Sequence, residues 1–336
     1  MTELVNARIL GLGHYVPDRV VTNDDLARVM DTCDEWIQQR TGIRERHFIS
    51  ADAGPADLAV EAVRGALAEA GLSAGQMDLI LLGTLSPDID FPASASLLQR
   101  HLGVRGMPVM DVRNQCSGFL YMLAVADKFI RTGAARYVLV VGAETHSTGL
   151  DLSTLGREVA VIFGDGAGAA VLGPEPDPRR GILSTHLHSE GRYAEKLMVE
   201  APTSRQRPRL TADMLSEPGS RLWPRMEGRY VFKHAVTRFP EVIQEALAAN
   251  GCTLEDIDLL VPHQANLRIS QIVAMGLGLS EDRVFNNIDR YGNTTAASIP
   301  IALHEAVLAG RVRPGSLVCL AAFGAGFTWA SALLRW

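Results

Sequence analysis

The sequence of 336 residues has only four cysteines, and no two of them are close together in the chain. Cys33, Cys116, Cys252 and Cys319 lie far apart and include no CxxC pair. This spacing predicts neither a zinc site nor a disulfide framework. We therefore expect no metal, a reducing compartment and a cytoplasmic location.

The chain also lacks an excess of positive charge, because its 32 lysines and arginines face 38 aspartates and glutamates, for a formal net charge of −6. This balance gives no bulk electrostatic reason to bind nucleic acid, which we do not expect as a partner. A local cluster can still bind a phosphate group, and Arg40, Arg44 and Arg46 are candidates for one.

Targeting and membrane signals are missing as well. The first residues contain no basic region followed by an apolar stretch, so we expect no signal peptide. The stretch Ser316 to Leu334 has nineteen residues without a charge, which is long enough for a membrane helix. Gly324 and Gly326 interrupt it, and its two flanks are typical of buried strands joined by a glycine turn. We expect no membrane partner.

The pattern that is present alternates apolar strands with amphipathic helices, which predicts an α/β fold. One helix is expected to begin at Pro55 and to stop at Gly71, with a strand from Leu79 to Leu82 after it. Its apolar face comprises Leu58, Val60, Ala62, Val63, Ala66 and Leu67.

Two internal echoes indicate that the chain consists of two homologous halves. The segment at 250–261 repeats the pattern of 70–81, in which a helix ends, the chain turns, and an apolar strand follows an aspartate. Asp258 matches Asp78 at an offset of 180 in the numbering. The segment at 323–333 echoes 163–172, with Phe323 matching Phe163 at an offset of 160. We interpret residues 1–175 and 176–336 as the halves, since a connection rich in proline, glycine and arginine separates them.

The span from Gly191 to Pro224 has little periodicity, and we expect it to form a long surface excursion beside the active site.

Cys116 is the candidate nucleophile. The segment 111–130 predicts a short strand, a sharp turn and a helix that Cys116 opens. Unpaired N–H groups and the helix dipole would then lower the pKa of its thiol and favour the thiolate. The alternative is a buried structural cysteine, which is how we interpret the other three cysteines.

His263 and Asn293 are the candidate partners of this thiol. His263 follows an apolar strand at its carboxyl end, where ligands gather in α/β sheets. Asn293 follows Gly292 at the start of another helix, and either residue alone could be purely structural. The repeat connects them, because Cys116 and Asn293 would both begin the third helix of their halves, at an offset of 177. A thiolate with imidazole and amide N–H donors is suited to acyl transfer through an enolate.

With these residues in place, the sequence resembles the ketoacyl synthase III family, whose members are condensing enzymes that start fatty acid synthesis from acyl-CoA. The resemblance covers nearly the whole sequence. The motifs that carry it are DEWIQQRTGIRERH at 34–47, CSGF at 116–119, IFGDGAGAAVL at 162–172, VPHQANLR at 261–268, RYGNT at 290–294 and AFGAGFTW at 322–329.

The resemblance implies a thiolase fold, with two βα halves in a five-layered αβαβα core, and a homodimer without cofactors. It also implies a catalytic triad of Cys116, His263 and Asn293. An acyl group would pass from CoA to Cys116, and malonyl-acyl carrier protein would then decarboxylate and attack it. The products would be 3-oxoacyl-acyl carrier protein, CO2 and CoA, in fatty acid or polyketide initiation.

The same resemblance implies roles for further residues. The backbone N–H groups of Cys116 and Ala325 would form the oxyanion hole. Trp36 and Arg157 would bracket the CoA adenine, and Arg268 would contact the carrier protein. The pantetheine tunnel would be lined by Arg40, Thr41, Gly228, Phe232 and Asn266. Phe163 would line the acyl pocket, and Phe91 would cap the pocket of the partner subunit.

Three features depart from the family pattern. Asn114 and Gln115 precede the nucleophile where small residues are usual. Met275 and Gly276 replace a lysine pair that some relatives carry, which should weaken steering toward an acidic carrier protein. The excursion is longer than in compact relatives.

Other functions therefore stay open. One is a family variant that transfers acyl groups to a hydroxyl or amine, or joins two acyl chains without decarboxylation. Another is a silent partner in a heterodimer, although the intact triad argues against it. A dinucleotide-binding enzyme is disfavoured, because residues 164–170 lack the GxGxxG spacing and lead into a strand.

Overall fold

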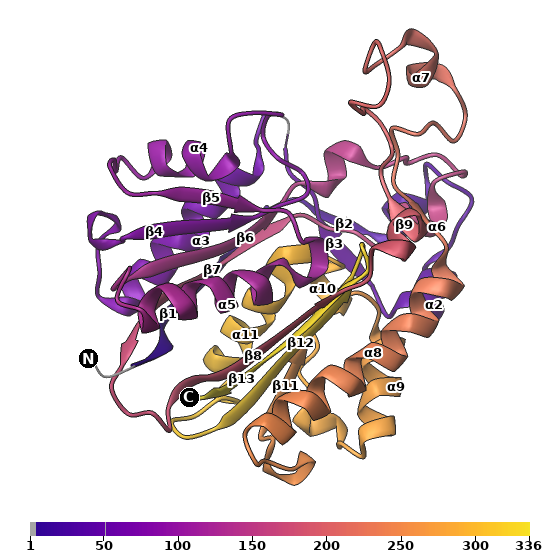
Figure 1. Ribbon diagram of the computed structural model, residues 1–336. Helices are drawn as coiled ribbons and strands as arrows, with labels where there is room; N and C mark the ends of the chain where they lie inside the picture. The colour runs from indigo at the N-terminus through magenta and orange to yellow at the C-terminus, as the bar shows by residue number, and fades with distance from the viewer. Residues whose placement is uncertain (1–4, 51) are drawn as a thin grey trace.

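The computed structural model describes residues 5–50 and 52–336 and is built on two central sheets (Figure 1). The first sheet has the strand order β1-β7-β6-β4-β5 and the second the order β11-β12-β13-β8. The strands of the first sheet are β1 (Asn6–Tyr15), β4 (Leu79–Gly83), β5 (Val109–Val112), β6 (Val138–Glu144) and β7 (Gly166–Glu175). Those of the second are β8 (Gly181–Ser189), β11 (Leu259–Pro262), β12 (Leu317–Gly324) and β13 (Thr328–Arg335).

Helices fill the space between the sheets and cover both outer faces. The middle layer consists of α5 (Gly118–Arg131) and α11 (Ser298–Leu308), whose apolar side chains share one core with both sheets. Helices α3 (Pro55–Ala70) and α4 (Ser94–His101) cover the first sheet, while α8 (Gly228–Ala249) and α9 (Leu267–Leu277) cover the second. These layers are the αβαβα arrangement expected for a thiolase fold.

Local signals explain several of these elements. Helix α3 begins at Pro55 and is stopped by Gly71, which has a left-handed φ of 65°. Strands β12 and β13 form an antiparallel hairpin where the charge-free stretch was expected to make two buried strands. In the described part of the chain no helix is both long and apolar enough to cross a membrane.

Strand pairing gives the register of the internal repeat. Leu79 pairs with Val138 as Leu259 pairs with Val318, so the two sheets repeat at the offset that relates Asp78 to Asp258. The matching of Phe163 with Phe323 is wrong. Phe323 lies inside β12, whereas Phe163 precedes β7. The reason is a long connection between β6 and β7, which contains the 3-10 turn η3 (His146–Gly149) and α6 (Arg157–Ala160), whereas β12 and β13 are joined by a tight turn. The division at residue 175 stays a prediction.

A smaller layer caps the region where the two halves meet. It comprises α1 (Asn23–Ala27), α2 (Asp34–Thr41), α10 (Ile288–Tyr291), β2 (Val20–Thr22) and β3 (Glu45–His47). Arg46 of β3 is completely buried, and its guanidinium donates to Val21 O, Asn23 Oδ1 and Val161 O. Arg46 is therefore not available to bind phosphate, contrary to expectation.

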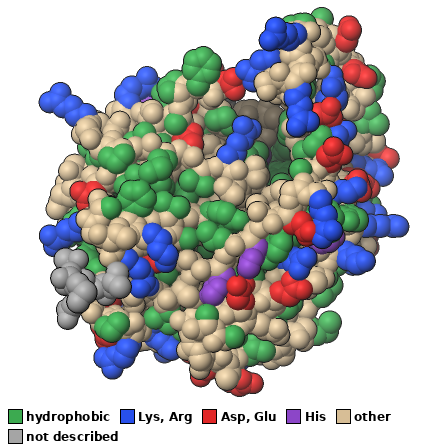
Figure 2. All heavy atoms as spheres, viewed as in Figure 1, with side chains coloured by type: hydrophobic (Ala, Val, Ile, Leu, Met, Phe, Trp, Pro, Cys, Tyr) green, Lys and Arg blue, Asp and Glu red, His purple; other side chains and the backbone are tan. Residues whose placement is uncertain are grey.

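The span 191–224 projects from the body of the molecule (Figure 1). It contains the 3-10 turn η4 (Gly191–Lys196), β9 (Leu197–Met198) and α7 (Ala212–Ser216), and it is followed by β10 (Arg225–Met226). Arg209 Nη1 contacts Asp90 Oδ2 at 2.7 Å, which ties the excursion to the loop that carries Phe91. A hollow with apolar side chains in its floor lies at the base of this projection (Figure 2).

Candidate active site

Cys116 lies in a strained turn between β5 and α5. The preceding Gln115 has a φ of +41°, and a 3-10 turn (Gln115–Ser117) leads into α5 at Gly118. Cys116 therefore stands two residues ahead of the helix and does not open it. Its side chain is buried against Gly324, where an added Cβ would lie 2.5 Å from Cys116 Cβ. Only glycine leaves this room.

Burial, and to a lesser extent the nearby carboxyl group of Glu144, raise the pKa of the Cys116 thiol to about 12. The backbone N–H groups of Ala325 and Cys116 itself oppose this shift. The expected lowering of this pKa is wrong, because desolvation outweighs the donors at the helix start. The thiol is neutral at rest, so its proton must leave during the reaction.

His263 follows β11, and its backbone N–H bonds to Ala321 O of β12 at 2.8 Å. The imidazole Nδ1 lies 2.6 Å from Ser298 Oγ at the start of α11. Its Nε2 is buried and has no hydrogen-bond partner among the described residues. Burial lowers the pKa of His263 to about 3, so the ring is neutral at physiological pH. One nitrogen is thus anchored and the other is left for a ligand.

Asn293 is fixed by its backbone and by its side-chain oxygen. Its N–H bonds to Ile162 O, and its carbonyl accepts from Gly164 N. Its Oδ1 accepts the N–H of Thr295 at 2.8 Å, which leaves the amide NH2 as the remaining polar end. Asn293 is buried, as a residue that binds an oxygen inside a closed site must be.

The turn after Asn293 is the counterpart of the Cys116 turn. Thr295 has a φ of +49° and opens a 3-10 turn (Thr295–Ala297) ahead of α11, and the strand offset matches it with Gln115. Ala296, and not Asn293, therefore occupies the position equivalent to Cys116. The offset of 177 is wrong, although the structure does bring the two turns into contact.

Helices α2 and α9 meet beside this centre. Asn266 caps α9 by accepting the Arg268 N–H at 3.0 Å, and its Nδ2 donates to Arg40 O at 2.9 Å. Thr41 is buried and bonds to Ile37 O within α2. The predicted tunnel residues Arg40, Thr41 and Asn266 are therefore neighbours on two joined helix ends.

Trp36 of α2 is half-buried, and two arginines lie near its ring. The guanidinium carbons of Arg40 and Arg157 are 4.4 Å and 5.4 Å from the ring centroid. Arg157 also bonds to the backbone oxygen of Asp31. The two residues predicted to bracket adenine thus already touch, and a base would have to part them.

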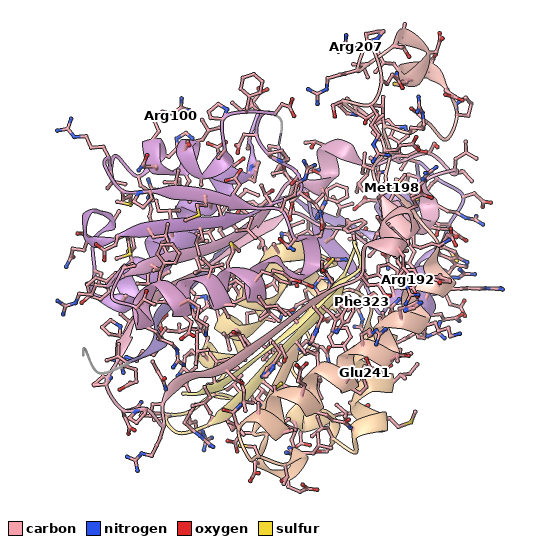
Figure 3. The ribbon with its side chains drawn as sticks, viewed as in Figure 1. Arg100, Arg192, Met198, Arg207, Glu241 and Phe323 are labelled. Atoms are coloured by element: carbon pink, nitrogen blue, oxygen red, sulfur yellow. The ribbon has the colours of Figure 1, made fainter. Side chains whose placement is uncertain are left out.

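The remaining predicted residues lie on other segments of the chain (Figure 3 draws the side chains from the same side as Figure 1 and labels Phe323 and Arg192). Gly228 begins α8, Phe232 lies one turn later, and the Arg268 guanidinium carbon is 5.8 Å from the Phe232 ring. Phe163 is buried and pairs with Asn293 through an isolated bridge. Phe91 is different, because 82% of it is exposed within the chain.

Sequence reasoning missed Ser298 and Glu144. Ser298 sets the His263 ring, and Glu144 accepts from Thr84 Oγ1, Ser86 Oγ and the N–H groups of Leu85 and Ser86. Neither position carries a motif of its own, and only the folded chain places them. Among the described residues, no cluster of His, Cys, Asp or Glu could hold a metal ion.

Comparison with known proteins agrees with this geometry. Family models match residues 110–191, described as "3-Oxoacyl-[acyl-carrier-protein (ACP)] synthase III", and residues 247–336, described as its C-terminal part. The chain is 50% identical over 332 residues to a beta-ketoacyl-[acyl-carrier-protein] synthase III of Rhodospirillum centenum, with 98% of both chains covered. It is 48% identical over all 336 residues to the enzyme of that name from Xanthomonas campestris, with both chains fully covered.

Among solved structures, it is similar to the 3-oxoacyl-[acyl-carrier-protein] synthase III of Aquifex aeolicus. The TM-score is 0.89 at 42% identity, and the match covers 98% of this chain and all of the other. Identity at this level along the full length shows that the chain belongs to the 3-oxoacyl-[acyl-carrier-protein] synthase III family.

Proposed function

We propose that this chain catalyses decarboxylative condensation of an acyl-CoA with malonyl-acyl carrier protein through an acyl-Cys116 intermediate. The observation that carries the proposal is the buried Nε2 of His263, which has no partner among the described residues, in a chain whose Cys116 is packed against Gly324 with no room for a side chain there. A donor buried in this way interacts strongly with a thioester oxygen, because bulk water does not compete for it.

In the first step the Cys116 sulfur attacks the acyl-CoA carbonyl carbon. The carbon–sulfur bond to CoA breaks. The proton of the Cys116 thiol is transferred to the CoA sulfur, and CoA is released as a free thiol. The N–H groups of Cys116 and Ala325 stabilise the oxyanion that forms in between. No cofactor is required, because CoA is itself part of the substrate.

In the second step the bond between the malonyl methylene carbon and its carboxylate breaks. CO2 leaves, and the electron pair forms an enolate whose oxygen is held by N–H groups of His263 and Asn293. For His263 this requires the tautomer with the proton on Nε2, which the Ser298 hydroxyl favours when it donates to Nδ1. The enolate carbon attacks the acyl carbon and expels the Cys116 thiolate, which takes a proton from solvent.

We assign substrate binding from the family resemblance. Trp36, Arg40, Thr41, Arg157, Gly228, Phe232 and Asn266 would bind CoA and its pantetheine arm. Arg268 would contact the carrier protein. We further infer a homodimer from the family resemblance, in which Phe91, 82% exposed within the chain, would be covered by the partner subunit. A reactive thiol such as Cys116 fits a reducing cytoplasm.

The test begins with intact mass of the enzyme after exposure to a panel of acyl-CoAs. An adduct that localises to Cys116 and is discharged by malonyl-acyl carrier protein, with one CO2 per ketoacyl product, is expected. An adduct that malonyl-acyl carrier protein leaves unchanged would overturn the condensing role and favour transfer to a hydroxyl or amine.

A further inference from the structure

His146 lies in the connection between β6 and β7, at the start of η3. It is buried, and its Nε2 is 2.7 Å from Thr295 Oγ1. Its ring centroid is 4.6 Å from that of Phe163. A histidine is a poor choice for a position that needs only apolar filling, because its ring nitrogens must be desolvated. Its hydrogen bond is therefore the feature to explain.

Thr295, the partner of His146, has a backbone conformation that branched residues rarely adopt. Its φ of +49° lies in the left-handed region, where a branched side chain is strained. Such a residue keeps its conformation only when its surroundings hold it. The His146 bond to Oγ1 restrains the side chain, and the Thr295 N–H bonds to Asn293 Oδ1 at 2.8 Å.

The three residues thus form one chain of contacts from the buried ring to the amide. With Oδ1 of Asn293 occupied by the Thr295 N–H, its NH2 group can point only to the other side. Phe163, whose ring packs against that of His146, is also joined to Asn293 by a backbone bridge, so His146 contacts two residues that are bonded to Asn293. Displacing the ring would loosen the amide without touching Cys116.

His146 has no separate acid–base task in this arrangement. Burial lowers its pKa to about 3, so it is neutral across the working pH range, and the Thr295 hydroxyl occupies its Nε2. In the described structure His263 is the residue whose buried Nε2 has no partner. His146 is suited to holding geometry and not to moving protons.

We propose that His146 is a positioning residue for decarboxylation, which acts through Thr295 to orient the Asn293 amide toward the enolate oxygen. This inference rests on the proposed function. It assigns to His146 an effect on the second half of the reaction only.

The test compares two replacements of His146. His146→Phe keeps an aromatic ring against Phe163 but removes the bond to Thr295, whereas His146→Gln retains a group that can reach the hydroxyl. We expect His146→Phe to lower the rate of CO2 release from pre-acylated enzyme about tenfold, the size of one lost hydrogen bond in the transition state. The acylation rate should not change, and His146→Gln should recover most of the loss. His101→Phe, on the distant helix α4, is the matched control and should change neither rate.

A double-mutant cycle then isolates the path through Thr295. Thr295→Val should slow CO2 release as much as His146→Phe does, and the double variant should be no slower than either single one. Additive losses, or equal losses in acylation and decarboxylation, would overturn the proposal, since both indicate general damage to the fold.

A readout independent of the reaction separates this proposal from the proposed function. Crystal structures of the wild type and His146→Phe should superpose in the backbone but differ in the position of the Asn293 amide. An unmoved amide refutes the role of His146 even if condensation is observed. If the wild type acylates but releases no CO2, the proposed function fails, and a displaced amide would still support the positioning role.

Discussion

The two halves of the chain build the same turn and use it differently. Gln115 and Thr295 are related by the strand offset, both have a positive φ, and each opens a 3-10 turn ahead of a central helix. In the first half the next residue is Cys116. In the second half the next residue is Ala296, and the candidate site residue is Asn293, three positions earlier in the chain.

The same contrast holds for the strand end and the helix start beside each turn. By strand register, Gly83 is the counterpart of His263, and Gly118 is the counterpart of Ser298. The second half therefore holds an imidazole on a hydroxyl where the first half has two glycines. An added Cβ on either glycine would come within 3.5 Å of Ala296 Cβ. The duplicated fold thus has the thiol in the first half and the imidazole and amide in the second. At the equivalent position each half has a residue without that functional group.

Exchanging the thiol between the turns should have the largest effect. Cys116→Ala is expected to abolish the acyl adduct, and Cys116→Ala combined with Ala296→Cys should not restore it. The side chain at 296 faces Gly83 and Gly118 inside the core, so a thiol there would not meet the substrate. Intact mass after acyl-CoA exposure checks this. An adduct at position 296 would show that the two turns are functionally interchangeable.

Removing the imidazole should be the next largest loss, and it should be confined to the second step. His263→Ala is expected to acylate normally but to release CO2 roughly 10² to 10⁴ times more slowly, the usual contribution of a positioned donor or acid. Ser298→Ala leaves the ring in place without its anchor and should cost about tenfold. Single-turnover assays of adduct formation and of CO2 release separate the steps. Equal loss of acylation in His263→Ala would contradict the division between the halves.

Much of this frame could be predicted from the sequence. The helix that begins at Pro55, the β12–β13 hairpin and the repeat through Asp78 and Asp258 all carry local signals of period, proline and glycine. Cys116 and His263 were predicted as site residues because each sits between an apolar strand and a helix. These features depend on neighbours in the chain.

What was missed depends on tertiary packing. The rise in the Cys116 pKa results from burial, and the burial of Arg46 results from carbonyl groups contributed by distant segments. The offset of the second echo failed because the connection that contains His146 is inserted in one half only. No local pattern reveals which polar group will be enclosed, so Ser298 and Glu144 went unnoticed.

Gly324→Ala should test how closely the second half approaches the nucleophile. The new Cβ would lie 2.5 Å from Cys116 Cβ and 3.2 Å from its backbone nitrogen, so the turn must shift. A displacement of about 1 Å costs roughly 10²-fold in rate, and we expect acylation to slow by that order. Gly276→Ala on α9 is the matched control, because its added Cβ would meet nothing within 4 Å. Acylation at the wild-type rate in Gly324→Ala would mean that the turn can shift without displacing Cys116 from its reactive position, and would contradict the prediction.

The smallest effect concerns stability, where two buried groups, Glu144 and His263, should respond to pH in opposite directions. Burial raises the pKa of Glu144 to about 7 and lowers that of His263 to about 3. Glu144 therefore contributes stability that is full below its unfolded pKa of about 4.5 and is lost as pH rises through 7. His263 contributes stability that is full above about 6.5 and is lost as pH falls toward 3.

Between about pH 4.5 and 6.5 both groups respond, so in the wild type their effects on the free energy of unfolding oppose each other. Glu144→Gln should remove the loss on the alkaline side and make stability rise more steeply with pH. His263→Asn should do the reverse, because it removes one group whose contribution opposes that of Glu144. His146, whose pKa burial also lowers to about 3, contributes equally to all three proteins. Urea unfolding of the three proteins at pH 5, 6 and 7 measures these slopes. Parallel slopes in the two variants would mean that neither buried group changes its protonation on unfolding.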